Sequence, residues 1–155
     1  PHSLKFFERM WNALYTENLV KILLAEHKGQ HVGGIILLKY GKGIYFWGSV
    51  LPEKFRYLNP TNYLLWQAIQ EGRQNGYEVF NFGRTRPGTG VYWFKAGWSG
   101  AEVELPHYYW FNGVKEESMP DPEEPRYKFL SKVWGLIPTF IARRLGPKVI
   151  GGIGL

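Results

Sequence analysis

Three strand-like segments, followed by one helix and one further strand, are the feature that most constrains the fold. Residues 20–27, 31–40 and 44–50 are rich in strand formers, and only short glycine-containing turns separate them. Short turns between successive strands favour an antiparallel meander. Gly33 and Gly34 fall inside the second segment, where paired glycines indicate a bulge or a close approach of another backbone.

A helical pattern begins after the third strand. Asn59 is a suitable capping residue and Pro60 suits the first helical position, while Gly76 marks the end. One apolar stripe runs along this helix: Leu64, Leu65, Ala68 and Ile69. Residues 78–82 then read as a strand. A helix that leads by a tight turn into a strand completes a parallel strand–helix–strand crossover, which starts from residues 44–50.

Shorter elements are predicted on both sides of this crossover. Residues 4–14 have apolar side chains at helical spacing, and Ser3 can cap that helix. Residues 91–96 form a short helical turn. Residues 101–111 are expected to form one or two last strands, interrupted by Pro106. The predicted fold is therefore α/β, with a mixed and mostly antiparallel sheet.

The composition changes after residue 115. We expect residues 1–115 to form one domain and residues 116–155 to be a linker and a C-terminal tail, first acidic and proline-rich, then basic and apolar. A basic apolar tail can lie on an anionic membrane surface. The alternative is that it packs on another domain or on this domain's own sheet. Because the chain starts at Pro1, we expect it to be a fragment of a longer protein.

Composition excludes several kinds of chemistry. With 155 residues and 45% hydrophobic residues, the chain can bury a globular core. The absence of cysteine removes disulfides and thiolate nucleophiles and fits a reducing, cytoplasmic compartment. The four histidines have no metal-ligand spacing, so no metal is expected, and only His107 is worth considering as a base. The net charge of +6 favours anionic partners such as phosphates, nucleic acid or a membrane surface.

Five short motifs occur in order along the chain: Asn-Pro-Thr-Asn-Tyr-Leu-Leu-Trp at 59–66, Asn-Gly-Tyr at 75–77, Phe-Asn-Phe-Gly-Arg at 80–84, Gly-Thr-Gly-Val-Tyr-Trp-Phe-Lys at 88–95 and Gly-Trp at 97–98. Together they resemble the second acyltransferase domain of Fem-type (FemAB-like) proteins. These are the peptidoglycan-bridge aminoacyltransferases and their relatives, including a branch linked to exopolysaccharide and protein-sorting systems. The resemblance covers about residues 6–111. It implies a GNAT-type N-acyltransferase fold and a similar N-terminal domain in the same protein.

The resemblance also implies an activity. Family members move an amino acid from aminoacyl-tRNA to a lysine-type amine of a cell-envelope precursor, and others in the wider group are acyl-CoA enzymes. We therefore expect an aminoacyl or acyl transferase without a tightly bound cofactor, whose co-substrate is aminoacyl-tRNA or acyl-CoA. Two alternatives stay open: a non-catalytic module that binds tRNA or another anion through its basic charge, and an acyl-CoA-dependent N-acyltransferase.

Lys95 is the best candidate for catalysis. Acyl transfer to an amine places negative charge on the carbonyl oxygen, so a cation or donor must be positioned there. In the resemblance, Lys95 falls on the Phe-Lys position whose lysine stabilises the tetrahedral intermediate or the carrier's phosphate. Phe94 would position it by packing. The alternatives are a solvated surface lysine and an ordinary core aromatic.

Five further residues are candidates for substrate binding. Arg84 and Arg86 follow a strand end, where ligands of open α/β sheets collect, and can bind phosphate or carboxylate. Arg56 precedes the helix start, as in acetyl-CoA enzymes of this fold, but the glycines that should follow it are absent, which counts against ordinary coenzyme A binding. Asn62 and Tyr63 are expected at the same pocket. For all five, the alternative is solvation, ion pairing, capping or packing.

Overall fold

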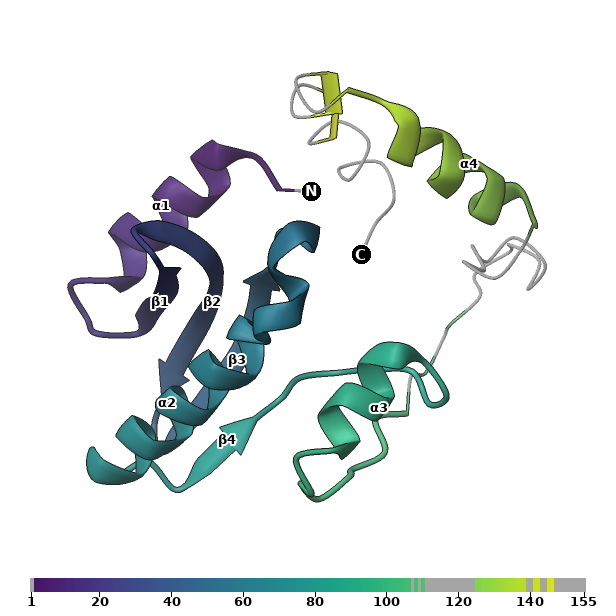
Figure 1. Cartoon of the computed structure of the whole chain (residues 1–155). Helices are drawn as coiled ribbons and strands as arrows, with labels where there is room; N and C mark the ends of the chain where they lie inside the picture. The colour runs from purple at the N-terminus through teal and green to yellow at the C-terminus, as the bar shows by residue number, and fades with distance from the viewer. Residues whose placement is uncertain are drawn as a thin grey trace. The chain divides into compact units, whose positions relative to one another are not determined.

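The computed structural model describes residues 2–106, 108, 110, 125–138, 141–142 and 145–146. Its elements, in chain order, are α1 (Leu4–Leu14), β1 (Val20–His27), β2 (Gln30–Tyr40), β3 (Gly43–Val50), the 3-10 helix η1 (Glu53–Leu58), α2 (Pro60–Gln74), β4 (Val79–Asn81), α3 (Gly90–Ala96) and α4 (Pro125–Leu136) (Figure 1). Except for η1, the order of elements up to Ala96 is the one predicted from the sequence.

The chain divides into two compact units. One is Glu8–Ala101, and the other combines Pro1–Phe7 with Glu102–Leu155. The second unit contains α4, where Phe129 and Leu136 are both exposed. No helix in the described part of the chain has the length and apolar content needed to cross a bilayer. The predicted boundary at residue 115 and the predicted membrane contact of the tail stay predictions.

The sheet has the strand order β1-β2-β3-β4. β1–β2 and β2–β3 are antiparallel, whereas β3 and β4 are parallel and are connected through α2. This confirms the predicted crossover and the GNAT-like mixed α/β fold. β4 pairs only with the first part of β3, from Gly43↔Val79 to Tyr45↔Asn81. Residues 46–50 of β3 therefore continue beyond the point where the parallel pair ends.

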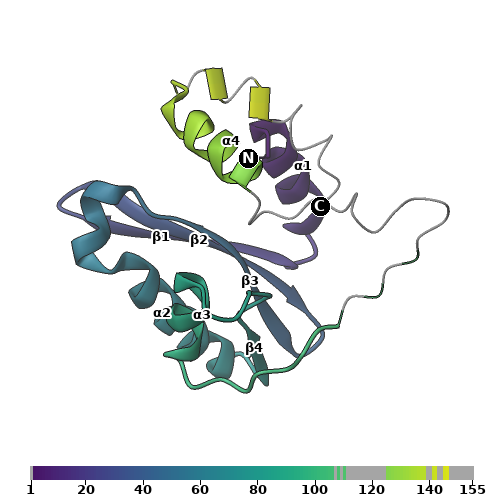
Figure 2. The same cartoon turned by 90° about the vertical axis from the view of Figure 1, so that its right-hand side faces the viewer.

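The hydrophobic core lies between α2 and the sheet face that it covers (Figure 2). Leu65 of α2 is completely buried, and Ile35 and Leu37 of β2 are at most 2% exposed. The predicted apolar stripe of α2 is confirmed for Leu64, Leu65 and Ala68, while Ile69 is only partly buried. Burying one such aliphatic side chain contributes about 1.5–3 kcal/mol, so this layer holds α2 against β2, and Ile44 of β3 and Phe80 of β4 pack with the same core.

The predicted close approach is found at both glycines, while the bulge lies one residue before them, at Val32. The β1–β2 register shifts between Ala25 and Glu26, directly opposite Gly33. A Cβ at Gly33 would lie 3.0 Å from Cγ of Pro60, and a Cβ at Gly34 would lie 2.9 Å from Cδ2 of Leu24. The absence of a side chain at Gly33 therefore lets the first turn of α2 approach β2 closely.

The start of α2 differs in part from the prediction. Pro60 is the first helical residue, as expected, but Asn59 makes no capping hydrogen bond through its side chain. Asn59 has a left-handed backbone with φ of 47°, and its N–H donates to the carbonyl of Arg56, which ends η1. Asparagine tolerates this conformation better than most residues. Its role is thus to turn the chain from η1 into α2.

A second prediction is corrected by the structure, namely the last strands expected at residues 101–111. The described residues of this segment, 101–106, 108 and 110, form no strand. Val103 and Leu105 are 78% and 61% exposed, so their apolar side chains contribute little to a core. Pro106 removes one donor from any ladder, and alternating apolar residues form a strand only where a partner strand pairs with them.

Candidate active site

A tight turn ends β4 beside the point where the parallel strands separate. The N–H of Gly83 donates to Oδ1 of Asn81 over 2.7 Å, and Gly83 has φ of 73°. Asn side chains stabilise turns in this way, and glycine adopts positive φ without a steric penalty. A Cβ at Gly83 would lie 3.4 Å from the carbonyl oxygen of Phe46. The loop after β4 therefore begins next to the part of β3 that pairs with β2 but not with β4.

The side chain of Lys95 forms hydrogen bonds with the backbone of this loop. Its Nζ donates to the carbonyl oxygens of Gly83 at 3.1 Å and Arg84 at 2.7 Å. A lysine ammonium has three N–H donors, and the described residues accept from two of them, which leaves one for a ligand. Burial lowers the pKa of Lys95 from its ordinary value, because desolvation disfavours the charged form. The ammonium is thus held at the end of β4 and does not swing freely in water.

Packing of α3 places Lys95 at this position. Phe94 is partly buried and packs against the hydrophobic core, as do Phe82 and Trp98 on either side of the loop and helix. The ring centroids of Phe82 and Trp98 are 5.6 Å apart. Phe94 thus has the packing contact expected of it, while its predicted contact with substrate stays a prediction.

Thr89 fixes the start of α3, a role that the sequence reasoning missed. Its Oγ1 accepts a hydrogen bond from the N–H of Tyr92 at 3.1 Å, and its hydroxyl donates to the carbonyl of Arg86 at 2.9 Å. Threonine is a favoured N-cap residue. A threonine two residues before the predicted helical turn at 91–96 was the signal that would have revealed it.

The arginines of the loop are exposed. Within the part of the chain that the structure describes, neither Arg84 nor Arg86 forms an ion pair through its guanidinium. The carbonyl of Arg84 contacts Lys95, so these cationic residues belong to one short loop and the helix that follows it. This grouping can present several positive charges to an anionic ligand.

Three other predicted residues lie on η1 and on the first turn of α2. Arg56 forms an ion pair with Glu53 at 3.0 Å, and both side chains are exposed. Asn62 and Tyr63 are exposed on α2. Among the described residues, no hydrogen bond or ion pair connects these three with Lys95. Their predicted ligand contacts stay predictions, and His107 lies outside the described residues.

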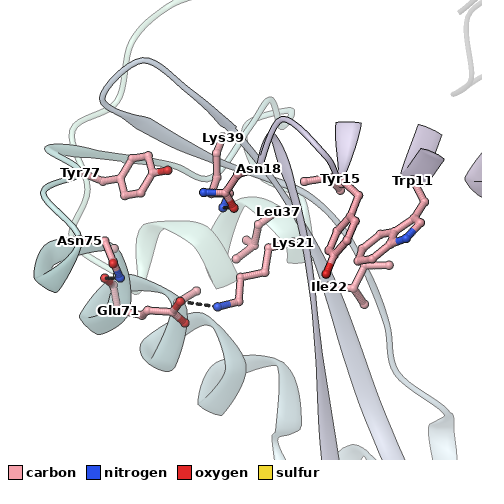
Figure 3. Close-up of a pocket in the computed structure, with 13 residues that line it drawn as sticks. Trp11, Tyr15, Asn18, Lys21, Ile22, Leu37, Lys39, Glu71, Asn75 and Tyr77 are labelled. Carbon is pink, nitrogen blue, oxygen red and sulfur yellow. Dashed lines mark hydrogen bonds and ion pairs between the residues drawn. The ribbon is translucent and has the colours of Figure 1, made fainter. Parts of the chain in front are cut away.

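The structure also contains a groove that the sequence did not indicate. It has a volume of about 490 Å³ and is lined by residues from α1 and the turn after it, from β1 and β2, and from the C-terminal part of α2 and the residues that follow it (Figure 3). None of the predicted site residues lines it. Within the described residues, no group of three His, Cys, Asp or Glu side chains is placed to hold a metal ion.

The profile of the acetyltransferase (GNAT) domain family matches residues 1–96, which is more than half of the chain. The chain belongs to the GNAT family. The match includes the sheet, α2, α3 and Lys95 of this GNAT domain. Among solved structures, the aminoglycoside N-acetyltransferase AAC(6')-Iy in complex with CoA is similar, with a TM-score of 0.46 and 13% identity, covering 72% of this chain and 93% of that chain. No curated protein sequence matches.

Replacing Thr89 with alanine in this GNAT domain should lower the free energy of unfolding by about 1 kcal/mol, since the N-cap of α3 is lost. Thr89→Ser keeps the hydroxyl and should change stability by less than half of that. Urea unfolding of both variants measures the difference. Equal stability of Thr89→Ala and the wild-type protein would contradict the capping role.

Proposed function

We propose that this GNAT domain is the second acyltransferase-like domain of a Fem-type transferase, which joins an aminoacyl or acyl group to an amine. The observation that carries the proposal is the position of Lys95. Its Nζ donates to the carbonyls of Gly83 and Arg84, beside the point where β3 and β4 separate. Among the described residues, the third N–H of the ammonium has no acceptor. Membership of the GNAT family supports an acyl group as the group that is transferred.

The proposed reaction requires an electrophile and a proton acceptor. The amine nitrogen attacks the donor's carbonyl carbon, a C–N bond forms, and the carbonyl oxygen becomes negative. The ester or thioester bond then breaks, and its electron pair leaves with the carrier's oxygen or sulfur. The proton of the amine passes to water or to the leaving group. Lys95 donates its remaining N–H to the carbonyl oxygen, where such a donor typically contributes 10²–10³-fold in rate.

The carrier is proposed to be anionic. The net charge of +6, together with the exposed guanidiniums of Arg84 and Arg86, supports binding of a phosphate-bearing carrier. Arg56 is paired with Glu53, and the glycines of an ordinary pyrophosphate loop are missing from residues 57–61. These two features favour aminoacyl-tRNA over acyl-CoA as the donor.

The partners of the domain are part of the same proposal. A similar N-terminal domain of the full-length protein would provide most of the acceptor site, and a cell-envelope precursor would provide the amine. The basic residues of the C-terminal tail would hold the protein at an anionic membrane surface in the cytoplasm. The same positive charge supports a second candidate function, which is binding of tRNA without catalysis.

A transfer assay separates these functions. The full-length protein is incubated with a lysine-containing acceptor and with either aminoacyl-tRNA or acyl-CoA, and mass spectrometry detects the amide. We expect an amide product from aminoacyl-tRNA. Salt-dependent tRNA binding without any product would favour the binding module, and product from acyl-CoA alone would favour the CoA-dependent enzyme. If the protein formed no product and also bound no tRNA, the result would contradict the proposal.

A further inference from the structure

The groove at the end of α2 is distinct from the proposed active site. Its walls come from α1, the turn between α1 and β1, β1, β2, α2 and residues 75 and 77, and it shares no residue with the loop and helix that carry Lys95. All of its lining residues belong to the compact unit Glu8–Ala101. Its volume of about 490 Å³ lies in the range of pockets that bind one small organic molecule.

Three charged side chains meet in the groove. Lys21 forms an ion pair with Glu71, and the two side chains are only 34% and 44% exposed. Lys39 donates a hydrogen bond to Oδ1 of Asn18, which is uncharged. Two ammonium groups thus face one carboxylate, which leaves one positive charge without a counter-charge among the described residues. The amide nitrogen of Asn18 and two N–H groups of Lys39 remain as donors.

The environment of Lys39 penalises its charge. Burial and the neighbouring charge of Lys21 lower the pKa of Lys39 from its ordinary value, and Glu71 raises it by a smaller amount. An anion beside Lys39 would remove part of this penalty, because an opposite charge favours the ammonium form. The same anion would accept the free N–H donors of Lys39.

The other side of the groove is aromatic. Trp11 and Tyr15 stack with ring centroids 4.4 Å apart and an interplanar angle of 20°. Tyr15 is 58% exposed, and Ile22 beside it is 41% exposed. In Figure 3, Trp11, Tyr15 and Ile22 lie together to the right of the Lys21–Glu71 pair, and Lys39 and Asn18 lie above it. The groove therefore has an apolar end and a cationic end.

We propose that this groove binds a small organic anion, with its carboxylate or phosphate on Lys39 and Asn18 and its flat apolar part against Tyr15. The distribution of charge and aromatic surface supports this class of ligand: a purely apolar molecule would leave Lys39 uncompensated, and an inorganic anion would leave the aromatic end empty. The site is independent of the proposed acyl transfer, because it uses no residue of that site.

The test measures binding of phenyl phosphate and of 3-phenylpropionate to the full-length protein by calorimetry, with Lys95→Ala as a background that excludes effects of the proposed active site. We expect both probes to bind at millimolar concentration and 3-phenylpropanol, which has no charge, to bind at least tenfold more weakly. Lys39→Met should raise the Kd of both anions by about tenfold or more, because one charge-assisted hydrogen bond is lost.

Two further variants complete the design. Tyr15→Ala should weaken both aromatic anions and leave inorganic phosphate unaffected. Lys42→Met is the matched control, because Lys42 is an exposed lysine that pairs with Glu78 outside the groove, and it should leave binding unchanged. If Lys39→Met does not fold, Lys39→Gln replaces it. Absence of binding by both probes, or binding that neither Lys39 nor Tyr15 variants alter, overturns the proposal.

Discussion

Replacing Lys95 with alanine should lower the turnover of the full-length transferase by about 100- to 1,000-fold, the usual effect of removing one donor from a developing oxyanion. The expected loss is in kcat, because the donor acts most strongly when the carbonyl oxygen becomes negative. Lys95 is only half-buried, and its contacts are made with two backbone carbonyls at the surface. The variant should therefore fold normally, which circular dichroism would verify.

Two control variants separate catalysis from loop support. Lys95→Arg retains a cation that can still donate to the Gly83 and Arg84 carbonyls, so it should retain more turnover than Lys95→Ala. Lys42→Ala removes an equal charge from a lysine whose side chain is 72% exposed, and it should leave kcat unchanged. If Lys95→Ala raised KM without lowering kcat, Lys95 would merely support the loop. Normal turnover in this variant would remove Lys95 from the mechanism altogether.

The second large effect is expected at Leu65. Leu65→Ala should destabilise this domain by about 2–5 kcal/mol, because Leu65 is completely buried and the cavity cannot be filled by neighbours that are themselves fixed in the core. Amide hydrogen exchange of β2 in the full-length protein measures this loss, since it reports on this sheet separately from other domains.

A surface variant on the same helix provides the comparison. Gln67 is exposed, so Gln67→Ala should change the protection of β2 by less than about 0.5 kcal/mol. Leu65→Met conserves most of the volume and should cost less than about 1.5 kcal/mol. Unchanged exchange in Leu65→Ala would show that α2 does not cover the sheet as described.

The local pattern of the sequence was sufficient to predict most elements of the domain. The strands and helices up to Ala96 were predicted because tight turns, apolar periodicity and a proline at the first helical position are signals that lie within the element itself or next to it. Two predictions failed, one because of an adjacent element that the sequence did not indicate and one because the deciding partner is distant. Asn59 has a different role because η1 precedes it, and residues 101–111 lack a strand in their described part because pairing depends on a neighbour.

Less of the candidate site than of the fold could be predicted from the sequence. The position of Lys95 followed from the resemblance of its motif, but its bonds with Gly83 and Arg84 depend on the turn that Asn81 makes. The groove could not be predicted at all. Lys21 and Glu71 are fifty residues apart and meet only because α2 crosses the sheet face beside β1.

The central claim is that an acyl donor binds with its reacting carbonyl beside the Lys95 ammonium. NMR of the full-length protein with ¹⁵N-labelled lysine tests it most directly, through titration with a non-hydrolysable aminoacyl-tRNA analogue. The account predicts that the side-chain resonance of Lys95 shifts in proportion to the bound fraction, while that of Lys42 does not move. A saturated complex in which the Lys95 resonance keeps its position would contradict the account.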